Sequence, residues 1–389
     1  MQKKKLLFVI DSLNCAGAEK SLVTLLSLID YTKYSVDLQL FSYGGEFEVF
    51  LPKEVNLLEP LPYTKYLEGK LPFTFKQFCS RIKYSISLRL CPNTHAAKAR
   101  MYWKHISPCI EINPNQYDCA IAYAQCIPTF YVIDKVNAKK KLGWVNCIFH
   151  LEGIEKAYQE RFYQSLDYIV TVSDSSYQHF TQVYPALKDK MEIIKDIVNP
   201  QFIEEMANFE SSLMKEKETT KLLTVARLNK PQKGYDISLE ACKLLKERGL
   251  DFKWYAIGRG EYRDEMIQFI EENHLQDTFI LLGTTPNPYP TIKDCTLYVQ
   301  TSRHEGFGLS IAEARILNRP VVTTEFDAVY NQMVQGKNGI VVPQDPIAVA
   351  DAIERVLKDK ELYDSIVAYQ KQEKKGNTEE IEKFYQLID

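Results

Sequence analysis

Short apolar runs alternate along most of the chain with longer stretches whose apolar residues recur at helical spacing. A continuous apolar run bounded by turn residues is typical of a buried parallel strand, whereas recurrence at i, i+3 and i+4 is typical of an amphipathic helix. In the first half of the chain the expected strands are residues 6–10, 36–41, 119–124, 141–145 and 168–172. This alternation predicts an α/β domain whose parallel, doubly wound sheet is covered by helices on both faces.

A second series of apolar runs predicts a second domain of the same kind. Its expected strands are residues 222–226, 252–257, 279–282, 297–300, 321–323 and 340–342. The intervening residues open with Asn-Pro, become acidic and polar, and show little apolar periodicity, which is typical of a linker. We therefore predict an N-terminal domain of residues 1–198, a linker of residues 199–220, a second domain of residues 221–372 and a C-terminal segment of residues 373–389. Ligands of open α/β sheets bind beyond the carboxyl ends of the strands, so the site is expected in those loops and between the domains.

The composition narrows the class of protein. The 389 residues are 45% hydrophobic and 25% charged, which is typical of a soluble globular chain long enough for two cores. Nine cysteines without a Cys-x-x-Cys pair, and no histidine at zinc-site spacing, indicate a reducing compartment and no metal site. Near the N-terminus a basic cluster precedes only five apolar residues, too few for a leader or a membrane span. We expect a first strand there and a cytoplasmic protein.

The charge is unevenly distributed. Residues 60–104 contain nine Lys and Arg and a single Glu, although the whole chain has a net charge of −3. Within this segment apolar residues recur at helical spacing with cations between them, namely Phe75, Phe78, Ile82, Ile86 and Leu90. Two interpretations remain open: a basic amphipathic helix through which residues 64–104 contact an anionic membrane, or a core-packing helix with a solvated basic face. The basic strip is local and the chain mildly acidic, so no nucleic-acid partner is expected.

A small-residue turn follows the first expected strand. It runs from Asp11 through Gly17 into an apolar-periodic helix, so its backbone amides could hold a phosphate. The same pattern is equally typical of an ordinary strand-to-helix turn.

The most informative run, Ser302 to Ala314, follows the expected strand at residues 297–300. Glu305 in the loop can reach a sugar, the amides at the start of the following helix can face a diphosphate, and Glu313 can meet ribose hydroxyls. The alternative is that both glutamates are structural, one at a helix start and one on a solvated face, but that leaves the two nearby glycines unexplained. The residues of this run that are predicted to contact a sugar nucleotide are Glu305, Gly306, Phe307, Gly308, Leu309 and Glu313.

Two cations follow the strand expected at residues 222–226. Arg227 and Lys233 could clamp a diphosphate and stabilise the negative charge that develops as it leaves. The sequence contains no Asp-x-Asp pair of the kind that binds metal in metal-dependent transferases. We therefore expect basic residues, and neither a metal ion nor a cofactor, to stabilise the leaving group.

With these residues the chain resembles the retaining glycosyltransferases of the GT-B fold, specifically glycosyltransferase family 4, over nearly its whole length. The similar features are the Glu305 and Glu313 pair, the Arg227 and Lys233 pair, the Gly17 turn and the run beginning at Asn338-Gly339. The resemblance implies two Rossmann-like doubly wound domains facing across a cleft, with a last helix that crosses back onto the first domain. It also implies that the second domain binds a nucleotide diphosphate sugar, most often a UDP-sugar, with Gly283 and Thr284 near the base. Transfer would retain the anomeric configuration, and the acceptor would be a glycan or a lipid-linked intermediate.

One position departs from the family pattern. Many members have a histidine just after the strand at residues 141–145, where this chain has Asn146, and His150 lies four residues later. Either His150 substitutes, or Asn146 contacts the sugar as a neutral group, or the enzyme is weakened. Two rival functions therefore remain: a sugar-nucleotide epimerase of the same fold and an inactive, transferase-like partner subunit.

Overall fold

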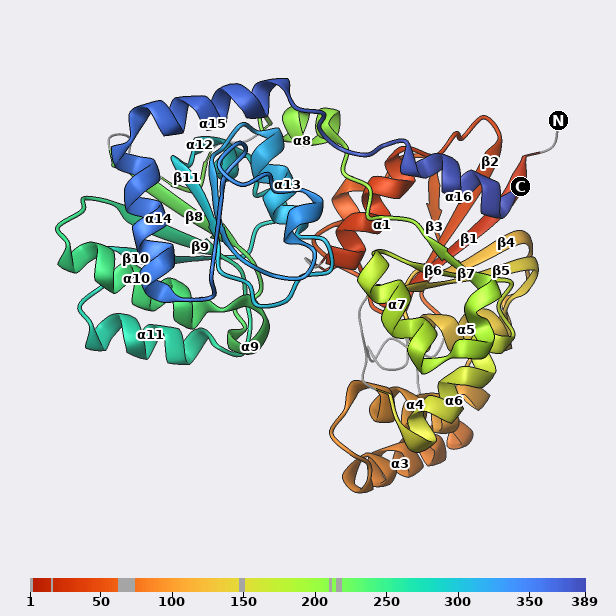
Figure 1. Cartoon of the computed structure of the whole chain (residues 1–389). Coiled ribbons are helices and arrows are strands. Elements are labelled where there is room, and N and C mark those ends of the chain that lie inside the picture. The colour runs from red at the N-terminus through yellow and green to blue at the C-terminus, as the bar shows by residue number, and fades with distance from the viewer. Residues whose placement is uncertain (1–2, 15–16, 62–73, 147–150, 210–211, 215–218) are drawn as a thin grey trace. The chain divides into compact units, whose positions relative to one another are not determined.

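The computed structural model describes residues 3–14, 17–61, 74–146, 151–209, 212–214 and 219–389. The chain forms two compact units, one of Met1–Ile197 with Glu379–Asp389 and the other of Val198–Thr378. Each unit contains a parallel sheet with helices on both faces (Figure 1). The predicted fold class, two doubly wound α/β domains, is confirmed.

The sheet of the first unit has the strand order β3-β2-β1-β4-β5-β6-β7. Its strands are β1 (Lys4–Ile10), β2 (Tyr34–Leu40), β3 (Val55–Leu57), β4 (Gln116–Ala122), β5 (Asn137–Val145), β6 (Tyr168–Thr171) and β7 (Met191–Ile193). Its helices are α1 (Gly17–Ser27), α3 (Phe75–Leu90), α4 (His95–Ile106), α5 (Ile127–Lys135), α6 (Gly153–Gln164), α7 (Asp174–Val183) and α16 (Glu380–Ile388), with short 3₁₀ turns η1 (Glu48–Phe50), η2 (Ser107–Cys109) and η3 (Pro185–Lys190). Every strand predicted in this half is present, whereas the three-residue strands β3 and β7 were not predicted.

Alternate residues of β1 supply two cores, as expected when successive side chains point to opposite faces of a sheet. Leu6 and Phe8 pack with residues of α1 and α16 on one face. Leu7 and Val9 pack with residues of α4 and α5 on the other. The apolar run is continuous because both faces of the strand are buried.

The sheet of the second unit has the order β10-β9-β8-β11-β12-β13. Its strands are β8 (Lys221–Val225), β9 (Lys253–Ile257), β10 (Phe279–Gly283), β11 (Leu297–Gln300), β12 (Val321–Thr324) and β13 (Ile340–Val342), and all were predicted. Its helices are α8 (Pro200–Met206), α9 (Lys230–Lys233), α10 (Tyr235–Glu247), α11 (Arg263–Glu272), α12 (Tyr289–Asp294), α13 (Leu309–Ile316), α14 (Pro346–Lys358) and α15 (Lys360–Gln372), with the 3₁₀ turn η4 (Val329–Asn331). Leu222 packs with the core of α10 and α14, and its neighbour Leu223 packs with the core of α12 and α13.

The segment predicted as a linker, residues 199–220, lies in the second unit. Asn199 caps α8, and Ile203, Ala207 and Met214 are buried with the core of α12 and α13. Their irregular spacing shows no periodicity in the sequence, which is why the sequence pattern predicts a linker there. At the other end, residues 373–378 stay with the second unit and Glu379–Asp389 joins the first.

The structure also shows the state of the cysteines and whether any described helix could span a membrane. The seven cysteines that the structure describes are all free thiols. Among the described helices, none is both long and apolar enough to cross a membrane.

Candidate active site

The carboxyl ends of β8 and β11 lie next to each other in the second sheet, where the strand order reverses. The chain continues from β8 to β9 on one side and from β11 to β12 on the other. Loops that diverge in this way leave the crevice in which open α/β sheets bind ligands. Arg227 and Lys233 follow β8 and Glu305 follows β11, so the fold brings these predicted residues to one edge.

The short helix α9 positions Lys233. Asn229 caps the helix, because its Oδ1 accepts a hydrogen bond from the Gln232 amide at 2.8 Å. Gly234 ends the helix with a φ of +63°, and a Cβ at this position would lie 2.1 Å from the carbonyl oxygen of Thr301. Only glycine therefore allows the loops after β8 and β11 to approach this closely.

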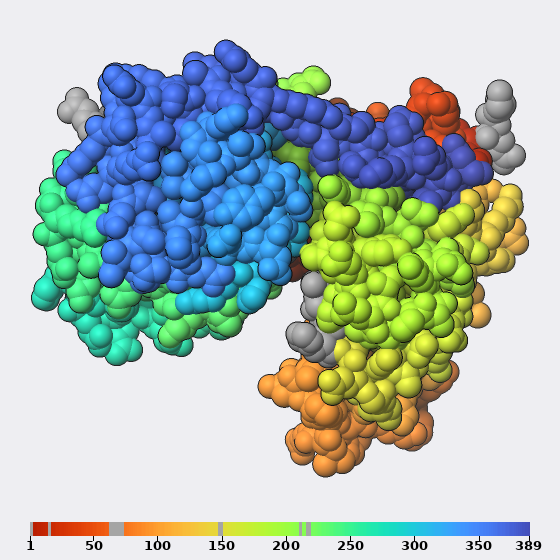
Figure 2. Space-filling model, in the orientation of Figure 1, coloured from red at the N-terminus to blue at the C-terminus, as the bar shows by residue number. Residues whose placement is uncertain are grey.

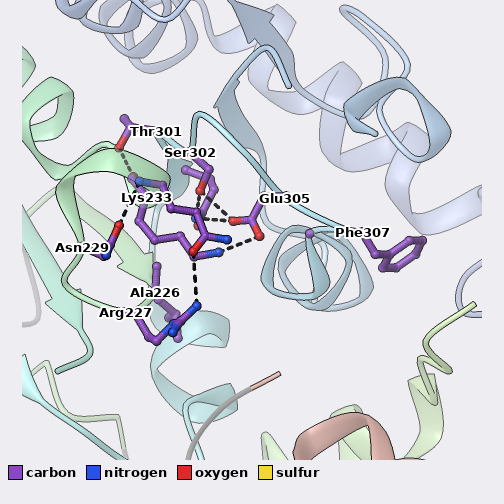
Figure 3. A network of polar contacts seen from close by, with 12 residues as sticks. Ala226, Arg227, Asn229, Lys233, Thr301, Ser302, Glu305 and Phe307 are labelled. Carbon is purple, nitrogen blue, oxygen red and sulfur yellow. Dashed lines mark hydrogen bonds and ion pairs between the residues drawn. The ribbon is translucent and has the colours of Figure 1, made fainter. Parts of the chain in front are cut away.

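Lys233 and Glu305 form an ion pair at the centre of the site (Figure 3). The Lys233 Nζ lies 2.6 Å from Glu305 Oε2, and the two side chains are 12% and 11% exposed. The second oxygen, Oε1, accepts from the Ser302 hydroxyl at 2.7 Å and from the Gln300 amide at 3.2 Å. Three donors, from α9, from the last residue of β11 and from the loop after it, thus hold the carboxylate in one orientation.

Gln300 is itself oriented by a buried tyrosine. The Tyr298 hydroxyl lies 2.9 Å from Gln300 Oε1, so the amide nitrogen faces Ser302, 2.7 Å away. Burial raises the pKa of Tyr298 well above its ordinary value, so this hydroxyl keeps its proton. Sequence reasoning missed these supporting residues, because polar residues at the end of a strand give no periodic signal.

A second ion pair fixes the loop that carries Glu305. Arg303 donates to both oxygens of Asp236, at 2.9 and 2.8 Å. It also donates to the Lys230 carbonyl at 2.8 Å, and its own amide donates to the Gln232 carbonyl at 2.8 Å. These hydrogen bonds hold the loops after β8 and β11 together.

Arg227 takes no part in the Lys233–Glu305 pair. Its side chain is exposed, and its Nη2 donates to Gln232 Oε1 at 3.2 Å. Among the residues that the structure describes, no carboxylate is paired with Arg227. Its guanidinium therefore remains available for an anion at the edge of the site.

Helix α13 begins where the sequence predicted, with Gly308 as the N-cap residue at a φ of +83°. The Gln332 amide donates to the carbonyls of Phe307 and Gly308, which fixes the turn before Leu309. The side chain of Phe307 points away from the Lys233–Glu305 pair (Figure 3). The amides of the first helical turn have no intrahelical acceptors, so this end of α13 favours an anion.

Glu313 lies on the buried side of α13 and is 2% exposed. Its Oε1 accepts a hydrogen bond of 3.3 Å from the Tyr289 hydroxyl. Burial and the neighbouring Glu313 raise the pKa of Tyr289 well above its ordinary value. The contact of Glu313 with a ribose stays a prediction.

Gly283 and Thr284 lie at the end of β10, on the same edge of the sheet, and both are exposed. Gly283 has a φ of +78° and accepts a hydrogen bond from the Gly258 amide at 2.7 Å. Their place near a nucleotide base likewise stays a prediction.

The remaining predicted residues belong to the first unit. Gly17 begins α1. Asn146 follows β5 and donates from Nδ2 to the Tyr123 carbonyl at 2.7 Å. The Asn146 Oδ1 is buried and, within the described part of the chain, no donor reaches it. His150 lies outside the described residues.

Near Asn146 lies a buried polar cluster that the sequence did not reveal. The Ser21 hydroxyl donates to Asp196 at 2.6 Å and lies 2.9 Å from the Tyr123 hydroxyl. Burial raises the pKa of Asp196 to about 6, against the opposing effect of the Ser21 hydrogen bond. The Tyr123 ring stacks on Trp144 with a centroid distance of 4.9 Å. Tyr123 therefore contacts the cluster through its hydroxyl and Asn146 through its carbonyl.

Comparison with known proteins finds a family match within the second unit. Residues 206–373 match the model of the family described as glycosyl transferases group 1. A stretch of 115 residues is 34% identical to a poly(ribitol-phosphate) alpha-N-acetylglucosaminyltransferase of Staphylococcus aureus, covering 29% of this chain but only 23% of that protein.

Two longer similarities extend over most of the chain. It is 26% identical to an N-acetylgalactosamine-N,N'-diacetylbacillosaminyl-diphospho-undecaprenol 4-alpha-N-acetylgalactosaminyltransferase of Campylobacter jejuni, over 83% of this chain and 81% of that protein. The crystal structure of S. aureus TarM with fondaparinux, alpha-GlcNAc-glycerol and UDP superposes with a TM-score of 0.70, at 15% identity, over 99% of this chain and all of that one. The chain thus has the GT-B fold, and its residues 206–373 are similar to the glycosyl transferases group 1 family.

Proposed function

We propose that this protein is a glycosyltransferase that moves a sugar from a UDP-sugar to a lipid-linked or cell-surface glycan intermediate, with retention of the anomeric configuration. The observation that carries the proposal is the Lys233–Glu305 pair, held by Ser302 and Gln300 at the edge between β8 and β11. It combines a cation for a leaving diphosphate with a carboxylate that can accept hydrogen bonds from sugar hydroxyls.

The chemistry of the pair supports this assignment. An ammonium has three hydrogens, and one of those of Lys233 is used on Glu305. The others can donate to phosphate oxygens, with the exposed Arg227 and the first turn of α13 as further partners. Negative charge grows on the diphosphate as the sugar bond breaks, so cations held in place beforehand stabilise the transition state more than the ground state. On this proposal no metal ion is needed.

The position of Asn146 supports a role in binding the sugar. Its amide nitrogen must face the Tyr123 carbonyl, so Oδ1 points the other way. A sugar hydroxyl that reached this buried oxygen would supply the donor that it lacks within the described residues. We therefore propose that Asn146 itself performs the contact for which family members use histidine.

The names of the similar proteins support the choice of substrates. The C. jejuni relative is named for a diphospho-undecaprenol acceptor, and the TarM crystal structure contains UDP. Because an acceptor linked to such a lipid is held in a membrane, we also propose that the protein acts at the inner, cytoplasmic face of the cell membrane.

The test is to incubate the purified protein with UDP-, GDP-, ADP- and dTDP-sugars, with and without EDTA and a membrane lipid extract, and to measure released nucleotide diphosphate. We expect release from one UDP-sugar, increased by the extract and unaffected by EDTA. NMR of the product should show the anomeric configuration of the donor.

Other outcomes identify the rivals. Conversion of the donor into another nucleotide sugar without any acceptor would indicate an epimerase. Nucleotide binding without release from any donor would indicate an inactive partner subunit. An inverted product would contradict the retaining mechanism.

A further inference from the structure

Helix α3 turns its apolar side away from the protein. Five large side chains, Phe75, Phe78, Ile82, Ile86 and Leu90, follow one another at intervals of three or four residues and share one face of the helix. They are between 44% and 83% exposed. We call this row the α3 stripe. It extends over about 22 Å at the helical rise of 1.5 Å per residue. A stripe of this kind normally faces a core, so its exposure marks an interaction surface.

The opposite, more polar face of α3 holds the helix to the first unit. The Ser87 hydroxyl hydrogen-bonds to His105 at 2.9 Å. The Tyr84 ring meets that of Tyr102 edge-on, with a centroid distance of 5.6 Å. At the start of the helix, Gln77 is buried and forms a capping box with Thr74. The outward direction of the stripe is therefore fixed by contacts on the other side of the helix.

The surroundings of the stripe are uniformly positive. Residues 74–106, which comprise α3 and α4, contain seven Lys and Arg and neither Asp nor Glu. Arg100 is neutralised by Glu155 at 2.8 Å. Within the described residues, Lys83 and Arg89 on α3 are exposed and have no acidic partner. Lys83 and Arg89 thus lie beside the stripe and are not consumed by ion pairs within the described residues.

The location of α3 suits contact with an extended surface. The helix packs on α4, and α4 in turn packs on α5 and α6, so α3 is the outermost layer of this part of the first unit. Residues 74–106, drawn in orange, project from the body of that unit (Figure 2). A flat partner can therefore reach the whole stripe.

We propose that the α3 stripe lies on an anionic lipid bilayer, with its apolar side chains among the acyl chains and the flanking cations at the lipid phosphates. The argument for a bilayer is charge complementarity. A second copy of this chain would bring Lys83 and Arg89 against their equivalents, which is unfavourable, whereas an anionic bilayer offers negative charge along the full length of the helix. This inference does not depend on the proposed reaction.

The experiment measures flotation of the full-length protein with vesicles of phosphatidylcholine alone or mixed with phosphatidylglycerol. We expect binding to the mixed vesicles that weakens as salt is added, since the Debye length shortens. Ile82→Asn/Ile86→Asn and, separately, Lys83→Glu/Arg89→Glu should each weaken partitioning by about 10-fold or more, because buried apolar area and each basic residue contribute independently.

Matched controls separate the α3 stripe from general effects. Lys53→Glu/Lys371→Glu makes the same change in net charge at exposed lysines elsewhere, and Ile347→Asn replaces an isoleucine that is 56% exposed in the second unit. Both should bind like the wild type. The proposal would be overturned if the wild type did not bind the mixed vesicles, or if the α3 variants bound them as well as the wild type does. It would also be overturned if light scattering showed a wild-type dimer that becomes a monomer in the isoleucine variant. Release of UDP from a water-soluble donor, assayed without vesicles, reports on the proposed reaction separately.

Discussion

Asn146 shows how a single side chain can be constrained by one backbone contact. Its Nδ2 donates to the Tyr123 carbonyl at 2.7 Å, which leaves Oδ1 as an acceptor. Asn146→Ala should therefore lower turnover by about 10- to 100-fold, because losing one hydrogen bond made in the transition state costs about 1–3 kcal/mol. Asn146→His should retain activity, because one ring nitrogen can still donate to Tyr123 while the other faces the sugar. Steady-state kinetics checks both, and full activity of the alanine variant would exclude a role for this side chain.

At the level of the element, the lack of a side chain at Gly234 allows the loops after β8 and β11 to approach closely. Gly234→Ala would place a methyl group against the Thr301 carbonyl at a positive φ. We expect it to lower the free energy of unfolding by about 2–4 kcal/mol, from strain and steric overlap together. Gly249→Ala is the control, since Gly249 also has a positive φ, +78°, but its Cβ would meet nothing within 4 Å. That variant should lose only about 1 kcal/mol, and equal losses in urea unfolding would refute the close-approach explanation.

The Arg303–Asp236 pair joins the same loops and predicts a pH dependence. Burial alone would raise the pKa of Asp236, but the hydrogen bonds and charge of Arg303 outweigh it and hold the pKa below the usual 3.8. Because the folded pKa lies below the unfolded one, the stabilisation is fully present above the unfolded pKa and is lost as the pH falls through the folded pKa.

Asp236→Asn should therefore destabilise the protein at neutral pH, and the difference from the wild type should shrink below about pH 4. Asp264→Asn, at a carboxylate that is 97% exposed, is the control and should change little. Urea unfolding at several pH values measures both. A difference that stays constant with pH would show that the charge of Asp236 is not what stabilises the loops.

For the molecule as a whole, the last helix completes the first unit although it follows the second in sequence. Phe384 is fully buried against Phe8 and Trp144, with ring centroids 5.8 and 6.2 Å away. Phe384→Ala should lower the stability of the first unit by about 3–5 kcal/mol. The control Phe209→Ala, at a side chain that is 75% exposed in the second unit, should cost about 0.5 kcal/mol or less. Calorimetry should show one of two unfolding transitions shifted, and a shift of both together would mean that the units unfold as one.

The sequence predicted the doubly wound sheets because both faces of each strand are buried, which makes the apolar runs continuous. It could not reveal three-residue strands such as β3, which are too short for a pattern, or α8, whose buried residues are irregularly spaced. Periodicity gave the extent of α3 but not the direction in which its apolar face points, because that depends on contacts such as Ser87 with His105.

The candidate site was predictable in part for a similar reason. Lys233 and Glu305 could be named because charged side chains follow adjacent strand ends in an open sheet. Their direct pairing could not be foreseen, since it depends on the turn at Gly234 and on Gln300, a strand residue whose amide is oriented by Tyr298. Arg227, predicted to act with Lys233, differs from it in being exposed and outside the pair.

The most direct test of the account is transfer of labelled sugar from a UDP-sugar to a membrane lipid extract, compared between the wild type, Lys233→Met and Lys230→Met. Methionine keeps the apolar stem of either lysine, and Lys230 occupies the other end of the same short helix. We predict that Lys233→Met lowers the transfer rate by about 100- to 1,000-fold, as loss of a charge-stabilising donor does, while Lys230→Met stays close to the wild type with both variants folded. Equal transfer by the Lys233 variant and the wild type would contradict the claim that the edge between β8 and β11 is the active site.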